Sequence, residues 1–570
     1  MIPGRWLLVL FSGVVLLLAA AAKRETRPAR RPAMIFISVD TLRADHLSAY
    51  GYSKKTSPVI DAVAARGLLF RNAVVPQPQT SPSHASMLTG VNPWKHGVLS
   101  NGFKMGAGVD TLATALRRAG YRTAGVVAIT HLGSNRGFAA GFQSFSEPSS
   151  LSAGQSHLTN RRDATTVNAE AVRLIDAHVA TKTAAPLFLF VHYFDCHYPY
   201  RSWDKSEDKS GEYTLTDLQA TQRQLARYDE GVTWTDRHLG QLLAHAKKRF
   251  GDDVIVAITA DHGEQIGDHE VPLGHNDIYS ETVNVPLVIA GPGIENGTVD
   301  ARVSTMDIPV TLAKLARTSL RNAVDGIDLM AVAEKEISLL GRVFGAKDER
   351  PFVVVGAPTY SRSLALIRGK DWFIENFDNA YRYARIESPA PAARTGRELA
   401  GKKSGDAMVY EVEVKRYQPF FVTFDHAAQC KATASAAIEP GFAYFQKPIE
   451  IAQSARITVP AARHDVVRLE VRPAACAGKT FMAVSRTAPP STTGTNDLFA
   501  NLPARRLRSN DELYDVQSDP RMLKNVLGDA AAAAPFARDL QSRFETMVRR
   551  TPVQKIPDEM LKSLRSLGYL

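Results

Sequence analysis

The sequence predicts an α/β fold: a large, mostly parallel central sheet with helices on both faces. Short β-branched runs alternate with helical patterns from Met34 onward, which is typical of β-α-β crossovers. The runs are apolar on both faces, as expected for strands covered on both sides. The chain has 570 residues, enough for one large α/β domain with smaller additions. Three cysteines exclude a scaffold built on disulfides.

The first 22 residues are expected to be a signal peptide or a membrane anchor. Arg5 precedes an apolar run over residues 6–22, and small residues at its end offer a cleavage site. The run lies at the short end of the roughly 17 to 25 residues that span a bilayer, so an uncleaved anchor is the alternative. We therefore expect an exported protein that is periplasmic, secreted or membrane-anchored through residues 6–22. Residues 23–32 are expected to be a basic linker.

The elements of the central domain are expected within residues 33–350. Predicted helices lie between its strands, at 57–67, 110–120 and 215–250. The strands are predicted at 34–39, 122–129, 186–194, 253–259 and 285–291.

The pattern of apolar and polar residues changes after residue 350. Residues 351–387 and 511–530 are expected to form a smaller C-terminal α+β subdomain. Residues 388–510 alternate with period two between loop-like flanks, so they are expected to be an inserted β-rich module. Its two cysteines, Cys430 and Cys476, are expected either to pair or to remain buried thiols. Residues 531–570 are expected to be a helical tail.

The charge of the chain does not indicate a nucleic-acid partner. The formal net charge is +11 and the pI is near 9.4, but the basic residues are scattered rather than interleaved with aromatics. We interpret the charge as favouring solubility and attraction to anionic surfaces or substrates.

Three predicted strands lead into residues that bind metals or move protons. The ends of parallel strands meet at one edge of a sheet, where ligands bind. A single such residue most often caps a turn, but several converging on one edge favour a metal-centred site. The residues are Asp40, His192, His197, Asp261 and His262.

A hydroxyl-rich loop, Thr80 to Ser86, opens a predicted helix at the same edge. A proline just after a hydroxyl residue is also an ordinary helix start. In the functional interpretation, the free N–H groups of the helix favour an anionic phosphoryl or sulfuryl group beside Thr80. A hydroxyl becomes a nucleophile only when a base or a metal activates it. Asp40, Asp261 and His262 supply the ligands for such a metal.

Several segments, in order, resemble the sulfatase branch of the alkaline phosphatase superfamily. The resemblance covers most of residues 34–330 and parts of the C-terminal region, but not the insertion. It implies an alkaline-phosphatase-like fold and a sulfatase-like catalytic domain over residues 33–350. The matching segments include SVDTLRADHLSAYGY, PQTSPSHASMLTG, VHYFDCHYPY, TADHGEQIGDHEVPLGHNDIYSETVNVPLVIAGPG, DELYDVQSDP and LRSLGYL.

The resemblance implies a role for each matching site residue. His197 matches a histidine that protonates the leaving group, and His275 falls near a substrate-contacting lysine or histidine. His84 stands where an arginine steadies nucleophile and metal. His131 and His269 are expected to be structural. The implied metal ligands are Asp40, Thr80, Asp261 and His262, and the implied catalytic residues are Thr80, His84, His197 and His275.

The departures from the family pattern bear on the chemistry. Thr80 replaces the cysteine that becomes formylglycine, so no formylglycine is expected. Thr41 replaces the second aspartate of an Asp-Asp pair, and His262 replaces an asparagine. Fewer carboxylates and one imidazole favour one divalent ion of manganese or zinc over calcium or magnesium.

The leading hypothesis is an exported, metal-dependent hydrolase of sulfate, phosphate or phosphonate esters, with Thr80 as the metal-activated nucleophile. Its substrates include esters linked to a glycan or a lipid. One alternative is a transferase that passes a phospho-group to a glycan or a lipid. The other is a non-catalytic sulfatase-like binding protein that keeps the metal and the anion, which the altered residues Thr41, Thr80 and His84 motivate.

Overall fold

The computed structural model describes most of the central domain and parts of the C-terminal region. The described residues are 31–101, 103–106, 108–149, 160–201, 218–270, 274–275, 277–337, 350–355, 363–376, 385–387, 397–414, 420–424, 431–437, 449–451, 454–458, 465–477, 480–484, 512–524, 526–527, 535–540 and 542. The predicted signal or anchor over residues 1–22 lies outside them, as do Cys430 and the side chain of Cys476. Among the described residues, no helix combines the length and apolarity that a bilayer span requires.

The central domain is built on an eight-stranded sheet in the order β4-β3-β5-β1-β6-β7-β2-β8. Neighbouring strands are parallel except at β7, which runs antiparallel to both β6 and β2. The prediction of a mostly parallel sheet is therefore confirmed. The strands are β1 (Ala33–Val39), β2 (Leu68–Val74), β3 (Arg122–Val126), β4 (Ser144–Ser146), β5 (Leu187–Tyr193), β6 (Val254–Ala260), β7 (Asn284–Ala290) and β8 (Gly297–Ser304).

Three strands of this sheet, β2, β4 and β8, were not among those predicted. In β2, Arg71 and Asn72 interrupt the apolar run where the pairing register shifts. Strand β8 lies at the edge of the sheet and carries polar residues, while β4 has three residues. A bulge, an edge and a short bridge all weaken the apolar periodicity on which strand prediction depends.

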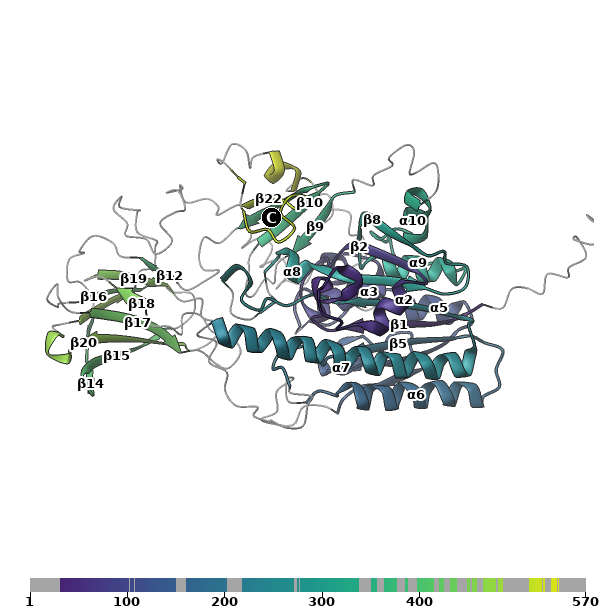
Figure 1. The fold of residues 1–570 in the computed structure, drawn as a ribbon, viewed down its shortest axis with the longest axis horizontal. Coiled ribbons are helices and arrows are strands. Elements are labelled where there is room, and N and C mark those ends of the chain that lie inside the picture. The colour runs from purple at the N-terminus through teal and green to yellow at the C-terminus, as the bar shows by residue number, and fades with distance from the viewer. Residues whose placement is uncertain are drawn as a thin grey trace, which may run out of the picture.

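Helices cover both faces of the sheet (Figure 1). One layer contains α2, α6 and α7, with α6 and α7 side by side, and the other contains α3, α5, α9 and α10. The helices are α2 (Pro58–Ala64), α3 (Thr80–Thr89), α4 (Pro93–His96), α5 (Leu112–Arg118), α6 (Ala164–Ala180), α7 (Leu218–Phe250), α8 (Ser280–Val283), α9 (Asp307–Leu315) and α10 (Leu329–Ile337), with 3₁₀ turns at Ala44–His46, Ser48–Tyr50, Thr130–Leu132, Ser134–Arg136, Asp268–Glu270 and Ala474–Cys476.

The C-terminal region has a sheet of its own, in the order β22-β11-β10-β9. The strands β9 (Phe352–Val355), β10 (Ser363–Arg368) and β11 (Asp371–Asn376) pair with β22 (Glu512–Asp515) from beyond the insertion. Between β11 and β22 in the sequence, the described strands form two five-stranded sheets, which lie apart from the central sheet in Figure 1. These strands are β12 (Arg385–Glu387), β13 (Arg397–Leu399), β14 (Lys402–Ser404), β15 (Ala407–Val414), β16 (Phe420–Phe424), β17 (Lys431–Ala437), β18 (Ile449–Ile451), β19 (Ser454–Thr458), β20 (Asp465–Arg472) and β21 (Thr480–Val484).

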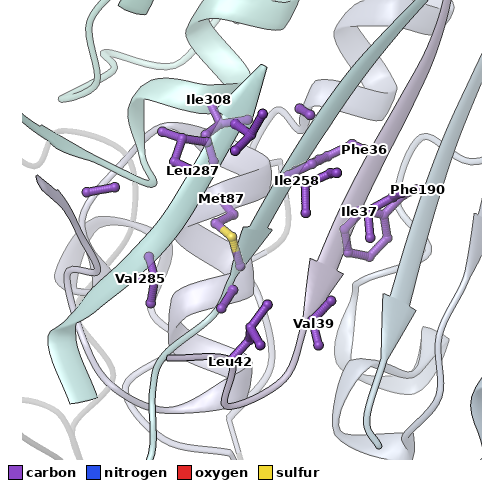
Figure 2. Packing of buried hydrophobic residues seen from close by; sticks show 14 of the residues in the cluster. Phe36, Ile37, Val39, Leu42, Met87, Phe190, Ile258, Val285, Leu287 and Ile308 are labelled. Atoms are coloured by element: carbon purple, nitrogen blue, oxygen red, sulfur yellow. The ribbon is translucent and has the colours of Figure 1, made fainter. Parts of the chain in front are cut away.

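Helix α3 is buried along its whole length, which fixes the position of the loop that opens it. Every residue from Thr80 to Thr89 is buried. Figure 2 shows Met87 of this helix within the apolar cluster that also contains Ile258 and Leu287. The helix ends at Gly90, whose φ of 71° is accessible to glycine without the strain of a side chain.

Substitution of Ile37 by alanine tests this core. Ile37 lies on β1, between β5 and β6, and is fully buried. We expect Ile37→Ala to lower the free energy of unfolding by about 2–5 kcal/mol, because the core around a deleted side chain collapses only in part. Leu523→Ala is the control: that side chain is 65% exposed, so a change within about 0.5 kcal/mol is expected. Denaturant unfolding of both variants measures the difference, and equal effects would contradict the packing.

Candidate active site

Two aspartates follow the ends of neighbouring parallel strands. Asp40 comes directly after β1 and Asp261 directly after β6. The last paired residues of these strands are Val39 and Ala260, so the two aspartates continue the same register. Strands pair about 4.8 Å apart. The sheet therefore places two carboxylates side by side, and both are completely buried.

One oxygen of each carboxylate is held by the protein and the other is bare. The N–H of Ala128 donates to His192 Nδ1 (3.3 Å), so His192 Nε2 carries the proton and donates to Asp40 Oδ2 at 3.2 Å. Asp261 Oδ1 accepts the backbone N–H groups of Thr41 (3.2 Å) and His262 (2.9 Å). Oδ1 of Asp40 and Oδ2 of Asp261 are buried and have no hydrogen-bond partner among the described residues.

His262 adds a third bare ligand atom. Its Nδ1 donates to the carbonyl of Gly263 at 2.9 Å, which leaves a lone pair on Nε2. This Nε2 lies 3.4 Å from Asp261 Oδ2 and 3.9 Å from Asp40 Oδ1. It too is buried without a hydrogen-bond partner among the described residues. Ligands around one transition-metal ion lie about 3 to 3.5 Å apart when each bond is about 2.1 Å long. The distance to Asp261 lies in this range and the distance to Asp40 is slightly longer, so a small shift of the Asp40 side chain would bring the three atoms around a single cation.

The electrostatics of this cluster also favour a cation. Burial raises the pKa of Asp40, and burial together with the charge of Asp40 raises the pKa of Asp261 well above its ordinary value. Burial lowers the pKa of His262 well below its ordinary value, which keeps the imidazole neutral. Two adjacent buried carboxylates are costly unless a positive charge compensates them. A divalent ion held by Asp40, Asp261 and His262 meets that need.

Thr80 and His84 come from the first turn of α3 and lie beside this cluster. Thr80 is the first residue of the helix, and its hydroxyl is among the groups that counter the effect of burial on the pKa of Asp40. His84 Nδ1 donates to the Thr80 carbonyl at 2.7 Å and lies 3.5 Å from Asp261 Oδ2. Burial lowers the pKa of His84 well below its ordinary value. His84 therefore supports the loop that carries Thr80 as a neutral imidazole, where the family pattern has a charged arginine.

Two more histidines lie on the other side of His262. The ring of His275 stacks on that of His262 with centroids 4.5 Å apart, and His197 lies 5.2 Å from His275. Burial opposes protonation of His275, but a 2.9 Å hydrogen bond and the negative charge of Glu264 raise its pKa. Burial and the neighbouring His275 lower the pKa of His197. The two histidines are therefore biased toward opposite protonation states.

The turn after Asp40 is strained. Thr41 has a φ of 55°, which is rare for a β-branched residue. Its carbonyl accepts the hydroxyl of Tyr228 from α7 at 2.7 Å, and that hydroxyl also accepts the N–H of Arg43. The turn directs the N–H of Thr41 to Asp261. Thr41 thus contributes a backbone contact, while its side chain offers no carboxylate.

The structure brings the predicted site residues into one cluster. Two other histidines were expected to be structural. His269 lies elsewhere, where it pairs with Glu281 and the carbonyl of Met522. The carbonyl of His131 accepts the Ser81 hydroxyl. The His131 side chain is also among the groups that lower the pKa of His197. The clustered residues are Asp40, Thr80, His84, His197, Asp261, His262 and His275.

Three contributing residues were not assigned roles from the sequence. His192 was counted among the strand-end residues that can bind a metal or move a proton, but it was given no specific role. Glu264 lies two residues after His262 within the DHGEQ segment. Arg161 lies in the segment before α6 and donates to the loop that carries His197. His192 and Glu264 both lie near the ends of strands, β5 and β6, that carry other site residues, and this position could have drawn attention to them. Nothing in the sequence around Arg161 indicates its contact.

Comparison with known proteins identifies a family for the chain. The Sulfatase family model matches residues 32–318, half of the chain. A Delta 4,5-hexuronate-2-O-sulfatase of Bacteroides thetaiotaomicron is 25% identical over 371 residues, 56% of this chain and 74% of that protein. The uncharacterized sulfatase YidJ of Escherichia coli K12 is 22% identical over 357 residues, 54% of this chain and 72% of that protein.

A solved structure, described as a 2-O GAG sulfatase, shares the fold at 16% sequence identity. It covers 91% of this chain and 93% of its own, with a TM-score of 0.53. The family match, the sheet and the solved structure agree. The chain belongs to the sulfatase family, within the alkaline phosphatase superfamily.

Proposed function

We propose that this protein is an exported, metal-dependent hydrolase of sulfate, phosphate or phosphonate esters with Thr80 as its nucleophile. One observation carries the proposal. Three bare, buried ligand atoms of Asp40, Asp261 and His262 converge beside a hydroxyl at the start of a buried helix. The apolar N-terminal run supports export.

The residues divide the reaction between them. A divalent cation held by Asp40, Asp261 and His262 would neutralise charge on the ester oxygens and favour the ionised hydroxyl of Thr80. Thr80 Oγ1 attacks sulfur or phosphorus after its proton has passed to solvent, because both oxygens of Asp40 are already committed to the cation and to His192. The bond to the alcohol breaks as a proton held by His275 passes to His197 Nε2 and from there to the departing oxygen. Water then cleaves the ester on Thr80 and releases sulfate from a sulfate ester, phosphate from a phosphate monoester, a phosphate monoester from a diester, or a phosphonate from a phosphonate ester.

The threonine directs the choice of substrate. A formylglycine hydrate carries a second hydroxyl that can expel sulfate, whereas a threonine ester must be cleaved by attack of water. Water can attack the phosphorus of such an ester and displace the threonine oxygen without help from a second hydroxyl. We therefore propose phosphate diesters and phosphonate esters as the preferred substrates, with manganese or zinc as the ion.

Removal of one metal-site charge should separate metal binding from fold stability. Asp261→Asn keeps the shape of the side chain but removes like-charge repulsion with Asp40. We expect the metal-free variant to be at least as stable as metal-free wild type. Its melting temperature should not rise when manganese or zinc is added. Thermal unfolding with and without each ion measures this.

Asp195→Asn is the matched control for that experiment. Asp195 is also buried, and burial raises its pKa to about 7, but its Oδ1 accepts the N–H of Ala164, away from the ligand cluster. This variant should keep the full metal-induced stabilisation. Equal metal-induced shifts in Asp261→Asn and wild type would place the ion elsewhere.

Substitution of the proposed nucleophile should abolish turnover. We expect Thr80→Ala to reduce kcat by at least about 10³-fold, in line with the loss of other covalent nucleophiles. Thr80→Ser should keep measurable activity, and mass spectrometry after rapid quenching should find the transferred group on residue 80. Ser81→Ala is the control, because the Ser81 hydroxyl donates to the His131 carbonyl at 3.1 Å. Full activity in Thr80→Ala would move the nucleophile to Ser81 or Ser83.

A substrate panel tests the reaction class. Purified protein is assayed with aryl sulfate, phosphate monoester, phosphate diester and phosphonate ester, each with added manganese, zinc, calcium or magnesium. We expect the diester or the phosphonate to be the best substrate, with manganese or zinc as the best ion. Metal binding without hydrolysis of any ester would favour a non-catalytic binding protein. Turnover only in the presence of a glycan or lipid alcohol would favour the transferase.

A further inference from the structure

The loop that carries His197 is not fixed by the sheet. His197 lies four residues beyond the end of β5. Its own N–H donates to the carbonyl of Phe194 at 3.3 Å, a long hydrogen bond. A group that transfers a proton must be held within a few tenths of an ångström of its productive position. Other contacts must therefore hold this loop.

Arg161 supplies those contacts. Its Nη1 donates to the carbonyl of His197 at 3.0 Å and its Nη2 to the carbonyl of Pro199 at 2.7 Å. One planar guanidinium thus ties two carbonyls on either side of Tyr198. Within the described part of the chain, no carboxylate lies at ion-pair distance from Arg161, and two of its donors go to this loop. The fork geometry of arginine suits such a double contact, and a lysine could not reproduce it.

A stack of rings joins Arg161 to the His197 imidazole. The guanidinium carbon lies 5.6 Å from the centroid of the Phe194 ring. The Phe194 ring in turn stacks on the imidazole of His197, with centroids 4.3 Å apart and planes at 18°. On the imidazole itself, Nδ1 donates to the Tyr198 carbonyl, which leaves Nε2 for the substrate side. Arg161 therefore restrains both the backbone and the ring plane of His197.

The start of α6 fixes Arg161. Asp163 is the N-cap of this helix and accepts the N–H of Thr166 at 2.9 Å. The neighbouring Arg162 donates its backbone N–H to Ala128 at 2.9 Å. Arg161 thus sits two residues before a capped helix, a rigid base from which to hold a loop.

We propose that Arg161 is a positioning residue that aims His197 Nε2 at the leaving-group oxygen of the substrate. This inference rests on the proposed ester hydrolysis, because only that reaction has a leaving oxygen to protonate. It adds a distinct expectation. The loss of Arg161 should matter in proportion to how much the leaving group needs a proton.

Leaving-group dependence separates positioning from a structural role. A nitrophenolate departs without protonation, whereas an alkoxide needs the proton in the transition state. A purely structural arginine would affect both substrates equally when it is removed. A residue that aims the proton donor affects mainly the alkyl ester.

The experiment compares Arg161→Gln with Arg162→Gln. The matched control Arg162 is the adjacent arginine, and its guanidinium donates to Ser146 and Glu147 instead of the His197 loop. Each protein is assayed with a 4-nitrophenyl ester and a benzyl ester of the same acid, in the class that wild type hydrolyses. For Arg161→Gln we expect kcat on the benzyl ester to fall by about 10²-fold, the cost of a misplacement of about 1 Å, and kcat on the nitrophenyl ester by less than about 5-fold. Arg162→Gln should leave the ratio of the two rates unchanged.

Two further variants complete the test. In a His197→Ala background, Arg161→Gln should cause little additional loss on the benzyl ester, because the group it positions is gone. Arg161→Lys keeps the charge without the fork, so it should show the same leaving-group dependence, and it serves if Arg161→Gln does not fold. Equal losses on both esters, additivity with His197→Ala, or full rescue by lysine would each overturn the proposal. Absence of hydrolysis by wild type itself would instead refute the proposed function.

Discussion

The site depends on two carboxylates buried side by side at the ends of adjacent parallel strands. The register of β1 and β6 puts Asp40 beside Asp261, and no rearrangement short of breaking that register separates them. Each carboxylate spends one oxygen on protein donors and keeps the other bare. Without a cation this arrangement would cost several kcal/mol per buried ion. The fold therefore maintains a costly arrangement that a divalent ion would relieve.

The turn that follows β1 shows how the protein maintains it. A left-handed β-branched residue costs about 1–3 kcal/mol. Thr41 adopts that conformation, and in doing so aims its N–H at Asp261. The hydroxyl of Tyr228, from the long helix α7, holds the turn: it donates to the carbonyl of Thr41 and accepts the N–H of Arg43. The substitution of an aspartate by threonine at this position thus removes a charge while the backbone continues to orient the remaining carboxylate.

The sequence was informative where chemistry coincides with regular structure. Asp40 and Asp261 follow strongly apolar strands, so their convergence followed from the parallel sheet, whereas Thr80 was identified from the resemblance of its loop to the sulfatase pattern. The antiparallel β7 and the polar edge strand β8 were less accessible, because pairing direction and edges leave little trace in apolar periodicity. His192 lies inside a buried strand, where nothing local shows that its proton goes to Asp40. Arg161 donates to the carbonyl of His197, which is 36 residues away in the sequence. Every residue has a backbone carbonyl, so the sequence does not indicate which one an arginine contacts.

His275 and His197 favour opposite protonation states, which suits a threonine nucleophile because threonine lacks the second hydroxyl of a formylglycine hydrate. Glu264 favours the proton on His275, while burial keeps His197 neutral. In the proposed first step, the pair gives up one proton to the departing alcohol. It then holds a bare imidazole nitrogen when water must attack the ester on Thr80, and by microscopic reversibility the same pair takes the proton from that water. A formylglycine hydrate needs only a proton acceptor for its own second hydroxyl. A threonine needs a base that faces incoming water, and in the proposed mechanism His197, held by its carbonyl and its ring plane, serves as that base.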